Sequence, residues 1–242
     1  MGLLSFLNVN KTKEKLIDYV YVCHEGDNEE LRYSIRSVIE NGPAGNIWIV
    51  GGKPDWYTGN FIFVEKDRNK YTHVRSSLNA IINSELIKDD FILMNDDFFI
   101  IKPLETIPVL HGGTLREKIS RHNRGSGSYG AMLHQVFSHL RKIEPNKDPL
   151  DYELHVPMEM NKQKLAKVIK KPYLWRSLYG NMFEVGGELL RDVKVYHKDS
   201  LEYALEVMER SPYISTNEAS FDKIIGDTIK EMFPNPSKYE HP

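Results

Sequence analysis

The sequence predicts an α/β protein built on a Rossmann-like, mainly parallel sheet, and three observations carry that prediction. Four short runs are apolar throughout, without polar alternation, which is typical of strands buried on both faces. Helical periodicity separates the first run from the second and the third from the fourth. The resulting order of strand, helix, strand, strand, helix, strand favours a sheet covered by helices on both sides.

The first predicted strand is "IDYVYVC", which begins at Ile17 and is rich in β-branched and aromatic residues. A helix follows, because Asp27 or Asn28 can cap its start and Asn41-Gly42-Pro43 ends it. Its apolar positions recur at helical spacing, at Leu31, Ile35, Val38 and Ile39. The next two strands are "NIWIVGG" and "NFIFVE". A second helix over residues 73–87 and a fourth strand, "FILMN", complete the predicted sheet.

Polar clusters stand at the ends of three of these strands. They are His24-Glu25-Gly26-Asp27, Gly51-Gly52-Lys53 and Asn95-Asp96-Asp97. In open α/β sheets, ligands bind outside the carboxyl ends of the strands. The two adjacent carboxylates of the last cluster repel each other, and a bound Mg²⁺ or Mn²⁺ with substrate phosphates as further ligands would relieve that repulsion. An ordinary β-turn is the alternative, since Asn and Asp are common turn residues.

The second half of the chain has a different texture. Residues 111–130 are rich in glycine and are predicted to form a mobile loop. Helices are predicted at residues 161–171 and 200–210, and the tail "FPNPSKYEHP" is expected to be frayed. Residues 111–150 hold seven Lys and Arg against three Asp and Glu, which fits a solvated basic face or a phosphate- or acceptor-binding loop equally well.

Composition sets the broad class. The chain has 242 residues, 40% of them hydrophobic and 27% charged, as in an ordinary soluble globular domain. The net charge of -2 argues against general polyanion binding by the whole surface. Cys23 is the only cysteine, so an intrachain disulfide and a cysteine-rich metal site are excluded. No apolar run approaches the roughly 18 residues of a membrane span, and a cytoplasmic location is expected.

Several blocks of the sequence resemble Stealth-type sugar-phosphate transferases and phage-encoded glycosyltransferases of the GT-A type. The blocks are "IDYVYVCHEGDNEELRYSIRSVIEN", "NIWIVGGKPDW", "DDFILMNDDFFI", "DPLDYELHVPM" and "RSLYGNMFEVGG", spread over roughly residues 17–196. The resemblance implies a GT-A-like glycosyltransferase fold, a nucleotide-sugar donor, and a DxD-like metal motif at residues 95–97. One departure is "VCHEGD", which stands where Stealth proteins have "TWVDG" and puts the donor base contacts and the transferred group in doubt.

The division of the chain follows from this resemblance. Residues 1–14 are an N-terminal extension, and residues 15–110 form the α/β half that binds the nucleotide sugar. Residues 111–232, an acceptor-binding and lid region, belong to the same domain, and residues 233–242 are the tail.

Candidate site residues come from both halves. Glu153 and His155 flank Leu154, so on an extended strand they point the same way and can serve as a general base and a metal or phosphate ligand. The predicted catalytic residues are Asp97, Glu153 and His155. The predicted ligands of Mn²⁺ or Mg²⁺ are Asp96, Asp97 and His155. The predicted donor contacts are His24, Glu25, Asp27, Arg32, Arg75, Asn79, Arg176 and Asn181.

Each of these assignments has a structural alternative. Arg32 shares a helical face with Arg36, and both can make minor surface salt bridges. Arg75 and Asn79 can belong to a solvated helix stripe. A lone histidine such as His155 is more often structural than catalytic.

Three functions remain open on the sequence alone. The leading hypothesis is a metal-dependent glycosyltransferase that moves a sugar from a nucleotide-sugar donor to an acceptor hydroxyl. Stealth-like transfer of sugar 1-phosphate is the first alternative, and a non-catalytic carbohydrate- or DNA-binding module is the second. The acceptor can be a virion protein, a modified DNA base or a glycan.

Overall fold

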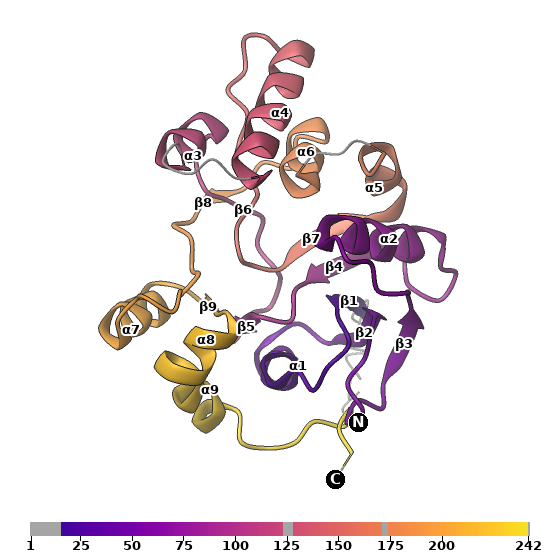
Figure 1. Cartoon of the computed structure of the whole chain (residues 1–242), viewed down its shortest axis with the longest axis vertical. Helices are drawn as coiled ribbons and strands as arrows, with labels where there is room; N and C mark the ends of the chain where they lie inside the picture. The colour runs from indigo at the N-terminus through magenta and orange to yellow at the C-terminus, as the bar shows by residue number, and fades with distance from the viewer. Residues whose placement is uncertain (1–15, 123–127, 171–173, 242) are drawn as a thin grey trace, which may run out of the picture.

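A five-stranded sheet in the order β3-β2-β1-β4-β7 organises the computed structural model, which describes residues 16–122, 128–170 and 174–241 (Figure 1). The strands are β1 (Ile17–Cys23), β2 (Gly45–Gly51), β3 (Asn60–Phe63), β4 (Asp90–Met94) and β7 (Met158–Asn161). The first four are parallel to one another, and β7 is antiparallel to β4. The predicted mainly parallel α/β fold is therefore confirmed. The extension predicted at residues 1–14 lies outside the described residues.

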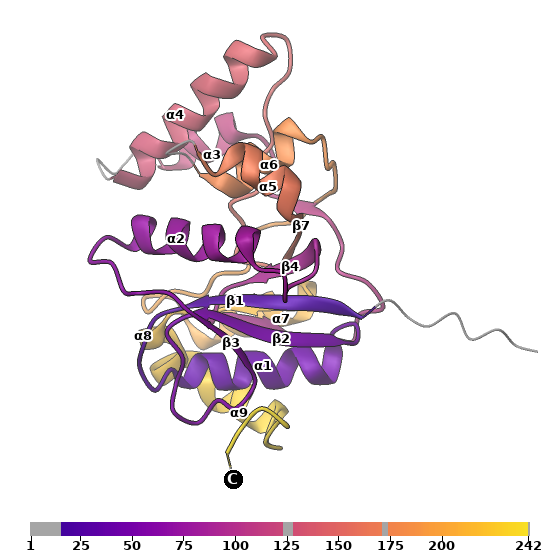
Figure 2. The ribbon, with the colours of Figure 1, turned by 90° about the vertical axis from the view of Figure 1, so that its right-hand side faces the viewer.

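Helices cover both faces of this sheet. Figure 2 shows α1 (Glu29–Asn41) on one face and α2 (Lys70–Asn83) on the other. Along β1, Tyr19 and Tyr21 belong to the core on the α1 side, whereas Val20 belongs to the core on the α2 side, and all three are 0% exposed. This double burial explains why the strand sequence is apolar without alternation.

Side-chain hydrogen bonds set the ends of the two helices. The Asn28 side chain accepts from the Leu31 N–H at 3.0 Å and starts α1, as predicted. α2 starts at Lys70 and ends at Asn83, so the prediction that it reaches residue 87 is wrong. The Ser84 hydroxyl accepts from the backbone N–H groups of Leu86 and Ile87, which turns the chain out of the helix.

A helical layer packs beyond α2. It contains β6 (Leu110–His111), α3 (Leu115–His122), α4 (Ser128–Ile143), α5 (Lys162–Val168), α6 (Trp175–Met182) and β8 (Glu188–Leu189). The prediction of a mobile loop over residues 111–130 is therefore wrong for the residues that the structure describes. Thr114 and Glu117 form a reciprocal capping box, in which the Thr114 N–H donates to the Glu117 carboxylate at 2.8 Å and the Glu117 N–H donates to the Thr114 hydroxyl at 3.2 Å.

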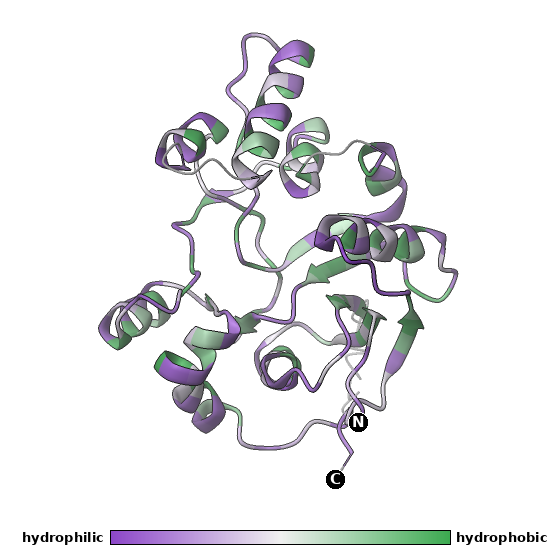
Figure 3. Cartoon of the chain, in the orientation of Figure 1, coloured by the Kyte–Doolittle hydropathy of each residue, from purple (hydrophilic) through white to green (hydrophobic). Residues whose placement is uncertain are grey.

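A third group of elements packs on the α1 side. It contains β5 (Phe98–Ile100), which pairs with β9 (Tyr213–Ser215), and α7 (Leu201–Arg210), α8 (Glu218–Ser220), the π-helical turn η1 (Phe221–Ile225) and α9 (Gly226–Met232). The predicted helices at 161–171 and 200–210 correspond to α5 and α7. Figure 3 shows the apolar strands in the interior of the fold. None of the helices in the described ranges is long and apolar enough to cross a membrane.

The C-terminal tail is not frayed, contrary to the prediction. The Tyr239 ring stacks on Tyr57 with 5.9 Å between centroids. The Glu240 carboxylate, which is 1% exposed, accepts two hydrogen bonds from the Arg36 guanidinium, at 2.6 and 2.9 Å. This bidentate ion pair fastens the tail to α1.

Candidate functional site

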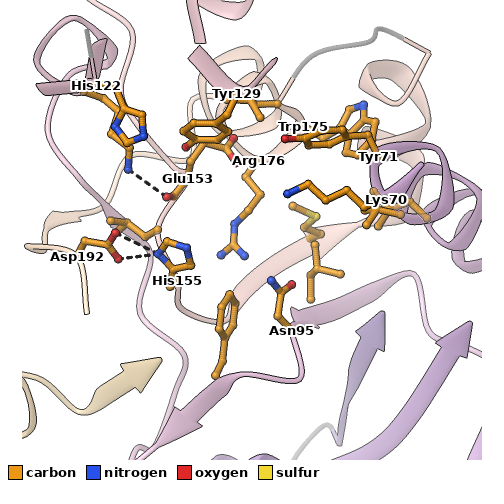
Figure 4. A pocket seen from close by; sticks show the side chains of 18 of the residues that line it. Lys70, Tyr71, Asn95, His122, Tyr129, Glu153, His155, Trp175, Arg176 and Asp192 are labelled. Atoms are coloured by element: carbon orange, nitrogen blue, oxygen red, sulfur yellow. Dashed lines mark hydrogen bonds and ion pairs between the residues drawn. The ribbon is translucent and has the colours of Figure 1, made fainter. Parts of the chain in front are cut away.

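A pocket of about 470 Å³ lies beyond the end of β4, between α2 and the helices α3, α4 and α6 (Figure 4). It brings together predicted site residues from distant segments, namely Asn95, Glu153, His155 and Arg176. Further polar lining residues are Lys70, Lys118, His122 and Asp192, and the aromatic ones are Tyr71, Phe98, Tyr129, Trp175 and Tyr196. Cations, carboxyl groups and aromatic rings in one pocket of this size are suited to a charged sugar derivative.

His155 and Asp192 form a hydrogen-bonded pair at the pocket wall. Nδ1 of His155 lies 2.9 Å from Oδ1 and 3.1 Å from Oδ2 of Asp192. Burial opposes ionisation of Asp192, but the hydrogen bond and charge of His155, with the charge of Lys118, outweigh it and hold the pKa of Asp192 below its usual value. An Nδ1–H bonded to a carboxylate leaves Nε2 with a lone pair, so His155 can accept a proton there.

Glu153 lines the same pocket from a loop. The strand predicted through Glu153 and His155 is absent, because these residues precede β7 in irregular structure, yet both side chains reach the pocket. The Ser177 N–H donates to the Glu153 carboxylate at 2.9 Å, and burial raises the pKa of Glu153. When protonated, such a carboxyl group can donate a hydrogen bond to a ligand hydroxyl, and when ionised it can accept one from it.

Arg176 places a half-buried cation in the pocket. Figure 4 shows its guanidinium between His155 and Asn95, with Lys70 approaching from α2. Its Nη2 donates to the Val156 carbonyl, but its Nε is buried without a partner, and no carboxylate in the described ranges forms an ion pair with it. Burial lowers the pKa of Arg176, although a guanidinium remains charged. A partly desolvated cation without an ion-pair partner among the described residues is suited to an anionic ligand.

The turn after β4 directs its carboxylates away from this pocket. The Phe98 N–H donates to the Asn95 carbonyl at 3.3 Å and closes the turn. Asn95 lines the pocket, whereas Asp96 accepts from the Asn28 amide at 2.6 Å and Asp97 lies 2.5 Å from the Lys194 ammonium. In the part of the chain that the structure describes, no three His, Cys, Asp or Glu side chains form a cluster that could hold a metal ion. The predicted ligand set of Asp96, Asp97 and His155 is thus not assembled.

Three predicted donor contacts lie at the end of β1. Glu25 and Asp27 line a second, more open pocket of about 620 Å³ together with Lys53 and two phenylalanines. His24 stacks on His73 with 4.5 Å between ring centroids, and burial, followed by the charge of His73, lowers the pKa of His24. The carboxylates of this second pocket can accept hydrogen bonds from ligand hydroxyls.

Apart from Arg176, which lines the first pocket, the other predicted donor contacts lie outside both pockets. Arg32 lies over the Trp56 ring at 4.7 Å and 3.6 Å from Glu240, on the α1 side. Arg75 and Asn79 are exposed on α2. The Asn181 side chain bonds the backbone N–H and carbonyl of Leu150, both at 2.8 Å, which is a structural role.

The sequence prediction missed Asp192, Lys194 and Tyr196. They alternate with Val193 and Val195, both 0% exposed, in an extended segment where the Val195 N–H donates to the Ser215 carbonyl at 2.8 Å. The alternation in "DVKVY" is the signal that could have revealed them, because an extended segment presents every second side chain on one face.

The architecture is that of GT-A-like glycosyltransferases. No protein family matches the chain, and no curated protein matches its sequence. The fold is similar to that of the WbbM bifunctional glycosyltransferase in its apo form, with a TM-score of 0.57, 12% identity, and coverage of 94% of this chain and 51% of that chain. This chain therefore spans about half the length of WbbM. The likeness confirms the expected GT-A-like fold.

Two further glycosyltransferase structures are similar at a lower level. The galactosyltransferase LgtC, in complex with donor and acceptor sugar analogs, matches 92% of this chain and 97% of its own, with 10% identity and a TM-score of 0.48. GlyE from Streptococcus pneumoniae TIGR4 matches 81% of this chain and 50% of its own, with 12% identity and a TM-score of 0.32.

Proposed function

We propose that the chain is a glycosyltransferase that moves a sugar from a nucleotide-sugar donor to an acceptor hydroxyl. The observation that carries the proposal is the presence of an unpaired Arg176 guanidinium and the His155–Asp192 pair in one pocket. A positive charge beside the departing diphosphate stabilises the leaving group, and a base beside the attacking hydroxyl can take its proton. The fold found in WbbM and the aromatic lining of the pocket support the same reaction class.

The leaving group is assigned to Arg176 and Lys70. As the bond between the sugar C1 and the diphosphate oxygen breaks, its electron pair leaves with the nucleoside diphosphate. The two cations stabilise the added negative charge, and one such preorganised contact contributes roughly 3 kcal/mol, or about 100-fold in rate. Because the hydrogen bond to the Val156 carbonyl holds Arg176 at the pocket, the guanidinium needs little rearrangement to act.

The acceptor is assigned to the part of the pocket that holds His155 and Asp192. Nε2 of His155 takes the proton of the acceptor hydroxyl while the acceptor oxygen forms its bond to C1. Asp192 holds the imidazole in the required tautomer and stabilises the imidazolium that forms. Trp175 and Tyr71 offer ring faces for the apolar side of a sugar, and Glu153 offers a hydrogen bond to one of its hydroxyls.

The donor nucleoside is assigned to the ends of β1 and β2. The carboxylates of Glu25 and Asp27 accept hydrogen bonds from its ribose hydroxyls, in keeping with the strand-end position of ligands in α/β sheets. Mn²⁺ or Mg²⁺ assistance remains a prediction of the sequence. The acceptor class also remains a prediction: a virion protein, a modified DNA base or a glycan.

Transfer of sugar 1-phosphate is a second candidate, favoured by the sequence blocks that resemble Stealth-type enzymes. In that reaction the acceptor oxygen forms a bond to the phosphorus that carries the sugar. The bond from that phosphorus to the bridging oxygen of the diphosphate breaks, and a nucleoside monophosphate leaves. The same Arg176 and His155 would serve it, since the leaving group is again a phosphate.

The released nucleotide tests the proposal. The full-length chain is incubated with a panel of nucleotide sugars and mixed sugar acceptors, and the nucleotide product is identified by mass spectrometry. Release of nucleoside diphosphate, lost in His155→Gln, is expected. Release of monophosphate supports sugar 1-phosphate transfer instead. Donor binding without release of any nucleotide would indicate a binding module and contradict the proposal.

A further inference from the structure

Lys194 is buried against the carboxylate expected to bind metal. Its side chain is 8% exposed, and its Nζ lies 2.5 Å from Oδ2 of Asp97 while also donating to the Thr216 carbonyl. Two partners on separate elements fix the position of the ammonium. Asp97 therefore already has a positive charge at hydrogen-bond distance.

The neighbouring acids have partners of their own. Asp96 accepts from the Asn28 amide at 2.6 Å, and the Glu30 carboxyl accepts from the Thr216 hydroxyl. Both acids therefore have a hydrogen-bond partner within the protein.

A divalent cation does not fit this arrangement. Mg²⁺ and similar ions need about six oxygen ligands at roughly 2.0–2.1 Å in near-octahedral geometry. The Lys194 ammonium lies 2.5 Å from the Asp97 Oδ2 atom, at the position where a cation bound by that oxygen would stand. A metal bound at Asp97 would stand next to a buried ammonium, and two like charges at that distance repel strongly in a low-dielectric site.

We infer that Lys194 takes the place of a divalent cation at the turn after β4, and that the chain binds no metal there. The ammonium neutralises Asp97 so that the strand end does not repel an approaching anion. The inference rests on the proposed function: the side-chain cations Arg176 and Lys70, and not a metal ion, neutralise the negative charge of the donor diphosphate.

Manganese binding tests the inference without any substrate. The full-length chain, stripped with a chelator, is titrated with Mn²⁺ and free ion is followed by its EPR signal. The wild type is expected to bind none at this turn. Lys194→Met leaves Asp97 unpaired and is expected to bind Mn²⁺ at least about 10-fold more tightly than the wild type. Adding Asp97→Asn to that variant should abolish the gain.

Two results overturn the inference. One is Mn²⁺ uptake by the wild type that Asp97→Asn removes. The other is a Lys194→Met chain that is folded by circular dichroism but binds Mn²⁺ no better than the wild type. If Lys194→Met does not fold, the comparison of the wild type with Asp97→Asn decides alone. Absence of donor turnover would contradict the proposed function and leave these outcomes unchanged.

Discussion

The Asp192 carboxylate lies 2.9 Å from Nδ1 of His155, although 37 positions separate the two residues in the chain. Two contacts hold Asp192 in place: the Val193 N–H donates to its Oδ1 at 2.9 Å, and Arg210 donates to its carbonyl at 2.8 Å. A histidine oriented in this way, beside an unpaired guanidinium, is suited to proton transfer during displacement of a phosphate leaving group.

Replacing Asp192 with Asn should slow turnover with little change in KM. The amide keeps the shape of the carboxylate but stabilises the wrong tautomer of His155 and no longer stabilises its cation, so kcat is expected to fall by about 100- to 10,000-fold. Steady-state kinetics across pH measures the effect. The matched control is Glu202→Gln at an exposed position of α7, which should leave kcat unchanged. A kcat near that of the wild type in Asp192→Asn contradicts the assigned role.

Replacing Arg176 with Met should separate activity from stability. The half-buried guanidinium forms no ion pair with a carboxylate of the described residues, so its removal is expected to change the free energy of unfolding by no more than about 1 kcal/mol. Donor turnover should fall about 100-fold or more. Urea unfolding and nucleotide release are measured on the same preparation, with Arg191→Met, 69% exposed, as the control. Loss of several kcal/mol would show that Arg176 is structural.

Arg36 and Arg32 should differ in their effect on stability, although they share α1. Arg36 is 8% exposed and pairs bidentately with Glu240, so Arg36→Met leaves a buried carboxylate uncompensated and should cost about 3–5 kcal/mol. Arg32 is 29% exposed and 3.6 Å from the same carboxylate, and Arg32→Met should cost about 1 kcal/mol or less. Equal losses in urea unfolding would mean that the tail is not anchored through Arg36.

Glu30 should make stability fall as pH rises. Burial raises its pKa from 4.5 to about 7, so the folded protein keeps a proton that the unfolded chain has lost. Its contribution is full below pH 4.5 and is lost as the pH rises through about 7. Glu30→Gln removes this pH dependence. As the pH rises from 4.5 to about 7, the free energy of unfolding of the variant should therefore increase by roughly 1–3 kcal/mol relative to that of the wild type. Thermal unfolding at several pH values measures the difference, with exposed Glu40→Gln as control; parallel curves for wild type and Glu30→Gln would refute it.

The sheet could be predicted from the sequence because its signals are local. The apolar run of β1 predicts a buried strand, and Asn28 predicts the start of α1, without reference to distant residues. The missed helix α3 was also local, since the Thr114–Glu117 capping box is visible in the sequence. The helix was not predicted because the glycine content of residues 111–130 favoured a loop.

Contacts between distant residues could not be predicted in this way. The Arg36–Glu240 pair spans 204 positions and the Lys194–Asp97 pair spans 97 positions. The sequence identified the carboxylates after β4 but not the lysine that pairs with Asp97, because only the folded chain brings β9 and its neighbouring segment to that turn.

Thermal unfolding across a panel of nucleotide sugars tests most directly whether the pocket binds a donor through Arg176. Wild type and Arg176→Met are compared in the presence of a chelator. At least one nucleotide sugar, at about 100 times its dissociation constant, should stabilise the wild type by about 2.7 kcal/mol and leave the variant unchanged. No stabilisation by any donor, or equal stabilisation of both proteins, would contradict donor binding at this site.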